Sequence, residues 1–182
     1  MQRFPQKPPA FEQLAASMEE QVYKTCYHMM GHREDAADCA QETMLRAYRS
    51  FASFRRESSF STWIIRIAIN VCTDELRKRR NVASLEEMRE SRGFDPPDPG
   101  KSAYLQLEEK ERRRLLYQAL DQLPPDSRAM IVMRDFRNLS YEEIAAVQNL
   151  PLGTVKSRIS RAREKLSALL QKSSELFSSP SV

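Results

Sequence analysis

Residues 140–170, SYEEIAAVQNLPLGTVKSRISRAREKLSALL, hold two helix signals with a turn signal between them. Ser140, followed three residues later by Glu143, is a capping-box pattern and predicts that a helix begins there. Asn149 and Pro151 predict its end, because Asn tolerates the left-handed conformation and Pro cannot continue a helix. A second helix is predicted after Gly153 by an apolar stripe at helical spacing, which comprises Val155, Ile159, Ala162, Leu166 and Leu169.

The two predicted helices have the spacing of a helix-turn-helix. Ala145 is small enough to let the helices cross closely, and Asn149 occupies the turn. Away from its apolar stripe the second helix carries a polar, basic face formed by Lys156, Ser157, Ser160 and Arg161. Such a face can enter a DNA major groove, whereas the plainer alternative is an ordinary helix pair with a solvated basic face. The capping box, the small residue, the turn residue and the polar, basic face together favour DNA binding.

The bulk properties indicate a helical protein with nucleic-acid partners. The chain has 182 residues with only 4 glycines and few β-branched runs, which favours an all-α fold of one large or two small domains. Formal charge is +3 over residues 1–80 (13 basic, 10 acidic), −4 over 81–111 (4 basic, 8 acidic) and +5 over 112–182 (12 basic, 7 acidic). Two basic blocks around an acidic connector suit two nucleic-acid-facing domains on a linker.

Membrane and disulfide signals are weak in this sequence. No stretch is long or apolar enough to span a membrane, and residues 1–11 lack the apolar core of a signal peptide. The 3 cysteines, Cys26, Cys39 and Cys72, are odd in number and irregularly spaced, which fits a reducing cytosol better than a disulfide framework. We therefore expect a cytoplasmic protein.

The first half of the chain predicts a disordered tail over 1–10 and three helices. One helix is expected from Phe11 to Met30, closed by Gly31, and a second from Arg33 to Ser50. The second helix has an apolar stripe of Ala37, Ala40, Met44, Ala47 and Phe51. Its opposite side carries Asp35, Asp38, Gln41, Glu42, Leu45 and Arg46. By periodicity alone that opposite side is typical of a solvated face.

A polar loop bracketed by Phe54 and Phe60 leads to the third helix, expected from Thr62 to Arg80 with Ser61 as its cap. Most of that helix is apolar, apart from a strip formed by Arg66, Asn70, Thr73 and Arg77. A mostly buried helix with one such strip can present it to an anion. Aromatic residues beside Arg and Ser suit unpaired nucleotides, although Phe60 and Trp63 taken singly are typical core residues.

Residues 81–103 contain three prolines and two glycines without periodicity and are predicted to be a flexible linker. The second domain, residues 104–172, begins with a charged helix that Pro124 and Pro125 end. Asp126 is expected to cap an element from Ser127 to Phe136, and residues 173–182 to form a frayed tail. The predicted fold is thus all-α, with two small helical domains, 11–80 and 104–172.

Two blocks of the chain resemble the extracytoplasmic-function group of bacterial sigma factors, related to sigma-70. The run DAADCAQETMLRAYRSFASFRRESSFSTWIIRIAINVCTDELRKRR, residues 35–80, resembles their domain 2. The run ALDQLPPDSRAMIVMRDFRNLSYEEIAAVQNLPLGTVKSRISRAREKL, residues 119–166, resembles their domain 4. The likeness covers nearly everything from Phe11 to Leu170 except the linker, and two blocks in this order are more specific than the helix-turn-helix alone.

The resemblance implies three functional surfaces. The surface for the clamp coiled coil of the polymerase largest subunit comprises Asp38, Gln41, Glu42, Leu45 and Arg46. The surface for the minus-ten element comprises Arg55, Glu57, Ser58, Ser59, Phe60, Trp63, Arg66, Asn70 and Arg77, with a flipped base captured by the loop. The surface for the minus-thirty-five element comprises Lys156, Ser157, Ser160 and Arg161, with Arg137, Ser140 and Tyr141 near its phosphates. Flipping a base out of the helix costs a few kcal/mol of lost stacking, so the protein pocket that binds the base must provide comparable stacking and hydrogen bonding.

The implied function is that of a dissociable promoter-specificity subunit of RNA polymerase, serving a stress or envelope-response regulon. Its implied partners are core polymerase (including the flap of the second-largest subunit), promoter DNA as duplex and single strand, and an anti-sigma factor. The acidic linker would thread toward the RNA exit path. Neither a cofactor nor a metal is implied, and no catalytic role. Two departures from the family pattern are Asn149, where Gly is common, and Ser160, where a larger residue can stand.

Three other interpretations remain open from sequence. A stand-alone helix-turn-helix regulator would need a sensor or receiver domain, and residues 1–80 lack an alternating strand–helix pattern. A metal sensor could use Cys26, His28, His32 and Cys39, but the two cysteines lack the spacing of a compact zinc site. An enzyme is disfavoured, because no nucleophile–base pair, paired acids or phosphate-cradling loop stands out.

Overall fold

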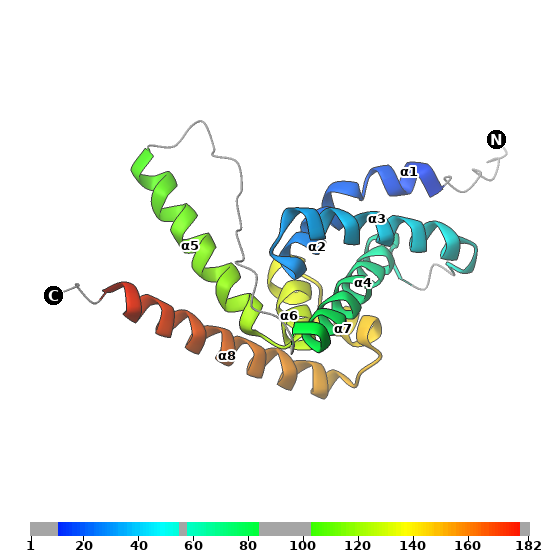
Figure 1. Cartoon of the computed structure of the whole chain (residues 1–182). Coiled ribbons are helices and arrows are strands. Elements are labelled where there is room, and N and C mark those ends of the chain that lie inside the picture. The colour runs from blue at the N-terminus through cyan, green and yellow to red at the C-terminus, as the bar shows by residue number, and fades with distance from the viewer. Residues whose placement is uncertain (1–10, 55–57, 84–102, 179–182) are drawn as a thin grey trace, which may run out of the picture.

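A computed structural model describes residues 11–54, 58–83 and 103–178, and every element in these ranges is helical. The first unit contains α1 (Phe11–Ala16), α2 (Glu19–Met30), α3 (Arg33–Ser50), the 3₁₀ turn η1 (Phe51–Ser53) and α4 (Phe60–Ala83). The second contains α5 (Ala103–Gln122), α6 (Pro125–Ile131), the π-helical turn η2 (Val132–Phe136), α7 (Tyr141–Gln148) and α8 (Leu152–Ser178). Figure 1 shows α5 and the C-terminal part of α8 extending away on one side, whereas the start of α8 packs against α6 and α7.

The helix predicted from Phe11 to Met30 is two helices, so that prediction was wrong. The chain turns at Ser17, whose hydroxyl donates to the Leu14 carbonyl at 2.7 Å, and a second helix starts at Glu19. Gly31 ends α2 as predicted. Its φ of 72° is left-handed, and its N–H donates to the Tyr27 carbonyl at 2.8 Å.

The core of the first unit lies between α2, α3 and α4. Helix α4 is buried on two faces, through Ile64, Ile65, Ala68, Ile69 and Cys72, as its apolar pattern predicts. Helix α3 buries a face rotated from the predicted stripe, formed by Ala36, Cys39, Thr43 and Ala47. Ala37, which was expected to be buried, is exposed. Thr43 fits among apolar neighbours because its hydroxyl donates to the Cys39 carbonyl at 2.7 Å.

Two predicted helix caps were wrong. Ser59, not Ser61, caps α4, since its side-chain oxygen accepts the Thr62 N–H at 3.0 Å and Ser61 lies within the helix. Asp126 does not cap α6, which begins at Pro125 after Pro124, where no side-chain cap is present. Pro at the first helical position needs no hydrogen-bond partner. Helix α8 continues to Ser178, past the boundary at Lys172 that the sequence suggested.

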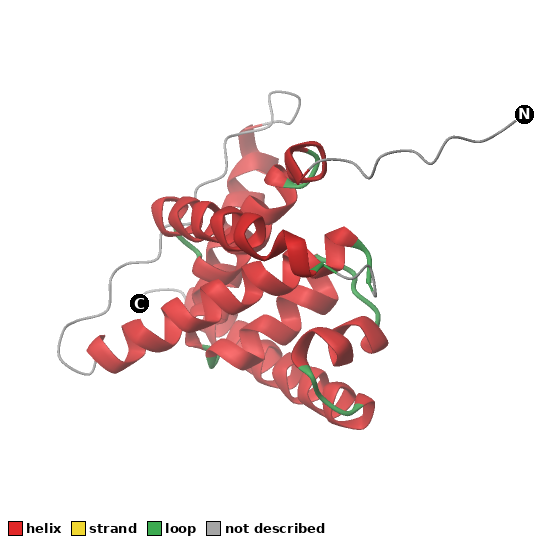
Figure 2. Ribbon diagram, turned by 90° about the vertical axis from the view of Figure 1, so that its right-hand side faces the viewer, coloured by secondary structure: helices red, strands yellow, loops and turns green. Residues whose placement is uncertain are grey.

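The two units pack against each other, and we call the surface between them the domain seam. It joins α2 and α4 of the first unit to α6, η2 and α7 of the second. Figure 2 shows helices closely packed in the middle of the molecule. One continuous apolar cluster runs across it, from Val22, Met29 and Ile65 to Leu123, Met130 and Ile144. The positions of the side chains that the sequence predicts to contact DNA therefore depend on both units.

Candidate nucleic-acid and partner interface

The helix-turn-helix forms as predicted. The Ser140 side chain accepts the Glu143 N–H at 3.0 Å, and the Glu143 carboxylate accepts the Ser140 N–H at 2.8 Å, which completes the capping box. Asn149 ends α7 in the left-handed conformation with φ 52° and ψ 50°. Buried Ile144 and Val147 of α7 lie in the same apolar cluster as Val155 and Ile159 of α8. This packing fixes which face of α8 is turned outward.

The outward face of α8 is polar and basic. Lys156, Ser160 and Arg161 are exposed, and Ser157 is half-buried. Ser157 accepts a hydrogen bond from Arg161 at 3.3 Å, and Ser160 donates to Glu164 at 3.0 Å. The structure thus gathers the four residues that the sequence assigned to base reading on one accessible surface.

Tyr141 lies beside that face at the start of α7. The Arg134 guanidinium carbon is 4.8 Å from the Tyr141 ring centroid, and the Lys156 amine is 5.9 Å from it. Both distances permit cation–π attraction. Arg163 pairs with Asp135 of η2, and that hydrogen bonding raises the pKa of Arg163. Two cations therefore lie at the Tyr141 ring, near which the resemblance implies phosphates.

Arg137, predicted to lie near phosphates, is used in the domain seam. Its guanidinium donates to the Gln21 side chain of α2 at 2.6 Å. Burial lowers the pKa of Arg137, and its buried Nε has no hydrogen-bond partner. This predicted minus-thirty-five residue is thus held against the first unit.

The predicted minus-ten residues line one side of α4 and the segment before it. Arg66, Asn70 and Arg77 are exposed along the helix, and Ser58 and Ser59 are exposed before it. Thr73, expected in the same strip, is buried, with its hydroxyl lacking a partner. Arg77 donates to Asp126 of α6 at 2.8 Å across the seam. The predicted residues Arg55 and Glu57 lie outside the described residues.

Phe60 and Trp63 belong to a larger group of rings, the aromatic cluster, which sequence reasoning missed in part; its members are half-buried except for the exposed Tyr48. Its other members are Phe11, Tyr48, Phe51 and Phe54. The Phe60 and Trp63 centroids are 5.5 Å apart, and Trp63 is 5.0 Å from Phe54. Aromatic residues at 48, 51 and 54 recur every third position before the loop, and that spacing could have indicated the cluster. Phe11 has no comparable signal.

The start of α4 also touches the helix-turn-helix. The Thr62 hydroxyl donates to Glu143 at 3.1 Å, using the second carboxylate oxygen of the capping box. Ser59 and Thr62 hydroxyls lie 2.9 Å apart. The segments that carry the two predicted DNA surfaces therefore meet at this contact, although Thr62 and Glu143 are 81 residues apart in the sequence.

The predicted polymerase surface occupies the exposed side of α3. Asp38, Gln41, Leu45 and Arg46 are exposed, and Glu42 is half-buried. Arg46 donates to Glu42 at 2.6 Å, which lowers the pKa of the Glu42 carboxyl. Leu45 is 45% exposed and Tyr48, which the sequence did not single out, is 63% exposed, so apolar surface is available beside the charges. A mixed surface of this kind suits a protein partner.

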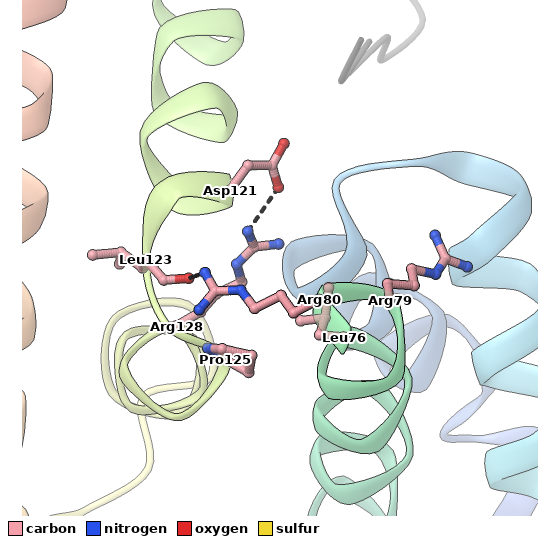
Figure 3. Close-up of a pocket in the computed structure, with 7 residues that line it drawn as sticks. All are labelled: Leu76, Arg79, Arg80, Asp121, Leu123, Pro125 and Arg128. Atoms are coloured by element: carbon pink, nitrogen blue, oxygen red, sulfur yellow. Dashed lines mark hydrogen bonds and ion pairs between the residues drawn. The ribbon is translucent and has the colours of Figure 1, made fainter. Parts of the chain in front are cut away.

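A pocket of about 180 Å³ lies in the seam between α4 and the α5–α6 corner. Figure 3 shows its lining, which comprises Leu76, Arg79, Arg80, Asp121, Leu123, Pro125 and Arg128. Arg80 donates across the seam to the Leu123 carbonyl at 2.6 Å. Arg128 is 3% exposed, donates to the Met29 carbonyl at 2.6 Å and pairs with Asp121 at 2.8 Å. Burial lowers the pKa of Arg128, and the charge of Asp121 opposes that effect.

Of the four residues considered as metal ligands, Cys26 and Cys39 both hydrogen-bond Cys72. Within the described ranges, no group of three or more His, Cys, Asp or Glu side chains could hold a metal ion. Instead, His28 lies 2.9 Å from the Tyr117 hydroxyl and its ring centroid is 4.1 Å from that of Phe136. Cys26, Cys39 and Cys72 are buried, and a hydrogen bond with Cys26 raises the pKa of Cys72. None of the described helices is long and apolar enough to cross a membrane.

Comparisons with known proteins match the two units separately. A family model described as Sigma-70 region 2 matches residues 14–82, and one described as Sigma-70, region 4 matches residues 113–166. The RNA polymerase sigma-H factor of Pseudomonas aeruginosa is 36% identical over 171 residues, covering 89% of this chain and 86% of that protein. The ECF RNA polymerase sigma-E factor of Escherichia coli strain K12 is 39% identical over 143 residues, covering 75% of this chain and 74% of that protein.

Two solved structures resemble the whole arrangement. One is the sigma factor RpoE in complex with the anti-sigma factor NepR from Bartonella quintana, with 28% identity and a TM-score of 0.68. It covers 88% of this chain and 96% of that one. The other is CnrH in complex with the cytosolic domain of CnrY, with 26% identity and a TM-score of 0.60. It covers 89% of this chain and 88% of that one.

Proposed function

The chain belongs to the extracytoplasmic-function group of the sigma-70 family of RNA polymerase sigma factors, and we propose how its surfaces divide the work of initiation. In this proposal residues 11–80 are domain 2, residues 81–103 the linker and residues 104–172 domain 4. The chain is a dissociable subunit without catalytic chemistry of its own, working in the cytoplasm. It directs core polymerase to promoters of a stress or envelope-response regulon.

Domain 4 binds the minus-thirty-five element through α8. Lys156 and Arg161 supply positive charge and hydrogen-bond donors on an exposed helical face, and Ser157 and Ser160 supply short polar groups between them. Ser140 and Tyr141 stand at the N-terminus of α7, where backbone N–H groups and nearby cations favour a phosphate. Base edges give specificity, while the phosphate contacts set the register.

Domain 2 holds the opened minus-ten element. Phe60 and Trp63 offer half-buried rings on which unpaired bases can stack, and Arg66 and Asn70 follow along the exposed side of α4. Stacking on an aromatic ring is worth about 1–3 kcal/mol per base, enough to repay the unstacking of a flipped base. Arg55, Glu57, Ser58 and Ser59 complete the proposed surface.

The exposed side of α3 binds core polymerase. Asp38, Gln41 and Glu42 provide a polar and acidic surface that Leu45 supplements with apolar area, and Arg46 holds the Glu42 carboxylate in place. This surface lies apart from the seam, so it stays available in the packed arrangement. We assign the clamp coiled coil to it, and the flap of the second-largest subunit to domain 4.

Contacts in the domain seam compete with DNA binding by two of the assigned residues. Arg77 and Arg137, both assigned to DNA, donate to Asp126 and Gln21 across the seam. Binding DNA through these side chains would require those contacts to be exchanged for phosphates. The neighbouring structures hold an anti-sigma factor or a cytosolic partner domain, and we propose that this chain has an anti-sigma partner too.

The observation that carries the proposal is the presence, in one chain, of an exposed basic recognition helix and a separate aromatic and basic α4 surface. A run-off transcription assay tests it. Core polymerase with the purified chain should transcribe promoters selected from a random library, and core polymerase alone should not. Duplex binding by the free chain, with no stimulation of transcription, would instead favour a stand-alone helix-turn-helix regulator.

A further inference from the structure

Phe11, the first residue of α1, packs edge-on against three rings of the aromatic cluster. Its ring centroid lies 5.5 Å from Tyr48, 5.3 Å from Phe51 and 6.3 Å from Phe60, with interplanar angles of 72°, 67° and 77°. Edge-to-face pairs at these separations are favourable beyond their burial. Helix α1 is thereby connected to the start of α4, where Phe60 is the first residue.

The turn at Ser17 makes this contact possible. Helix α1 has only 6 residues, too few to be stable in isolation. It is held by packing, with Ala15 buried and Phe11 half-buried against the cluster. A continuous helix from Phe11 to Met30 would carry Phe11 in another direction. The break that the sequence did not predict therefore directs α1 toward the cluster.

The rings that Phe11 supports are those proposed to receive unpaired bases. Phe60 contacts Phe11, Phe51, Phe54 and Trp63, with centroids 6.3, 6.1, 5.8 and 5.5 Å away. Phe60 is only half-buried, so it keeps some exposed surface while the neighbouring rings restrict its orientation. When the rings of a stacking site are already held in place, less side-chain conformational entropy is lost as a base binds.

We propose that Phe11 is a positioning residue for the unpaired-strand site, acting through Phe60 and Phe51 and not by touching DNA. This inference rests on the proposed function, since it presumes that Phe60 and Trp63 receive the minus-ten strand. It makes α1 part of promoter opening, outside the surfaces that the family resemblance implied. It also predicts that an aromatic ring, and not apolar volume alone, is needed at this position.

The test uses reconstituted holoenzyme and a fluorescent single-stranded oligonucleotide carrying the non-template minus-ten strand of a selected promoter. Phe11→Ala should weaken its binding about tenfold, the order expected for the loss of aromatic pair contacts. Phe11→Leu, which keeps apolar volume, should weaken it a few-fold by the same reasoning, and Phe11→Tyr should bind nearly as the original chain does. Glu12→Ala, exposed in the same helix, is the matched control and should change nothing.

Core binding and thermal stability are measured in parallel. Unchanged strand binding by Phe11→Ala would overturn the inference. So would equal strand binding by the Leu and Tyr variants, or a loss that merely follows a loss of core binding. Failure of the unsubstituted chain to support run-off transcription would reject the proposed function itself. The Phe11 variants test only the positioning role, so the two hypotheses are rejected by different results.

Discussion

Replacing Arg128 by Met should loosen the domain seam and destabilise the whole chain. Arg128 is 3% exposed and reaches from α6 to the Met29 carbonyl of α2 at 2.6 Å, while pairing with Asp121 at 2.8 Å. Met has a similar length but no donor. The Met29 carbonyl would lose its side-chain partner, and the Asp121 carboxylate would lose this cation.

The expected cost follows from those two contacts. Removing one partner of a buried ion pair costs about 3–5 kcal/mol. The Asp121 side chain is 24% exposed, so water compensates part of its loss. We therefore expect about 3 kcal/mol, toward the lower limit. In a chain of this size that is a fall of about 6–12 °C in melting temperature.

Chemical denaturation followed by circular dichroism measures the free energy, and small-angle scattering measures whether the units separate. Arg112→Met, exposed on α5, is the matched control and should leave both unchanged. Because Arg128 crosses the seam, its loss should also widen the difference between the denaturant concentrations at which the two units unfold. An Arg128→Met chain with the stability, dimensions and unfolding profile of the original chain would refute the reasoning.

Three further predictions concern the separate surfaces. Glu42→Lys should weaken binding to core polymerase at least tenfold by reversing a charge on the α3 surface, while Glu19→Lys on α2 should not; equal effects in a pull-down would remove the assignment. Arg161→Ala should lower affinity for the minus-thirty-five duplex by about 1–3 kcal/mol if Arg161 reads a base. Binding is measured with several duplex sequences and salt concentrations. A uniform loss across the sequences, with a weaker salt dependence, would instead identify Arg161 as a phosphate contact. Ser140→Ala should cost about 1 kcal/mol of unfolding free energy through loss of the cap, and an unchanged denaturation midpoint would contradict that role.

Local signals predicted the parts of the fold that local interactions determine. The Ser140–Glu143 capping box, the left-handed Asn149 and the break at Pro124 all involve residues within a few positions of each other. The bounds of α3 follow from its periodicity and from Gly31 before it. In contrast, the rotation of α3 that exposes Ala37 depends on how α2 and α4 pack against it, which no single stretch records.

The contacts across the seam could not be predicted, because their partners are distant in sequence. The sequence around Asp126 indicated a helix cap, yet in the structure Asp126 pairs with Arg77, which is 49 residues away. Gln21 and Arg137 are 116 residues apart. Nothing near Phe11 indicates that it meets Phe60, since the turn at Ser17 reorients α1. Most of the described residues of the predicted sites are exposed or half-buried on α3, α4 and α8. Arg77, Arg137 and Glu143 also hold the two units together.

Run-off transcription with purified core polymerase tests the sigma-factor assignment most directly. The template is a promoter selected from a random library by the reconstituted holoenzyme, with minus-ten and minus-thirty-five elements defined by the selection. Transcripts should require the chain, and should fall when either element is scrambled, because each domain holds one of them. A chain that binds core polymerase but yields no transcript above core alone, at any selected promoter, would contradict the account.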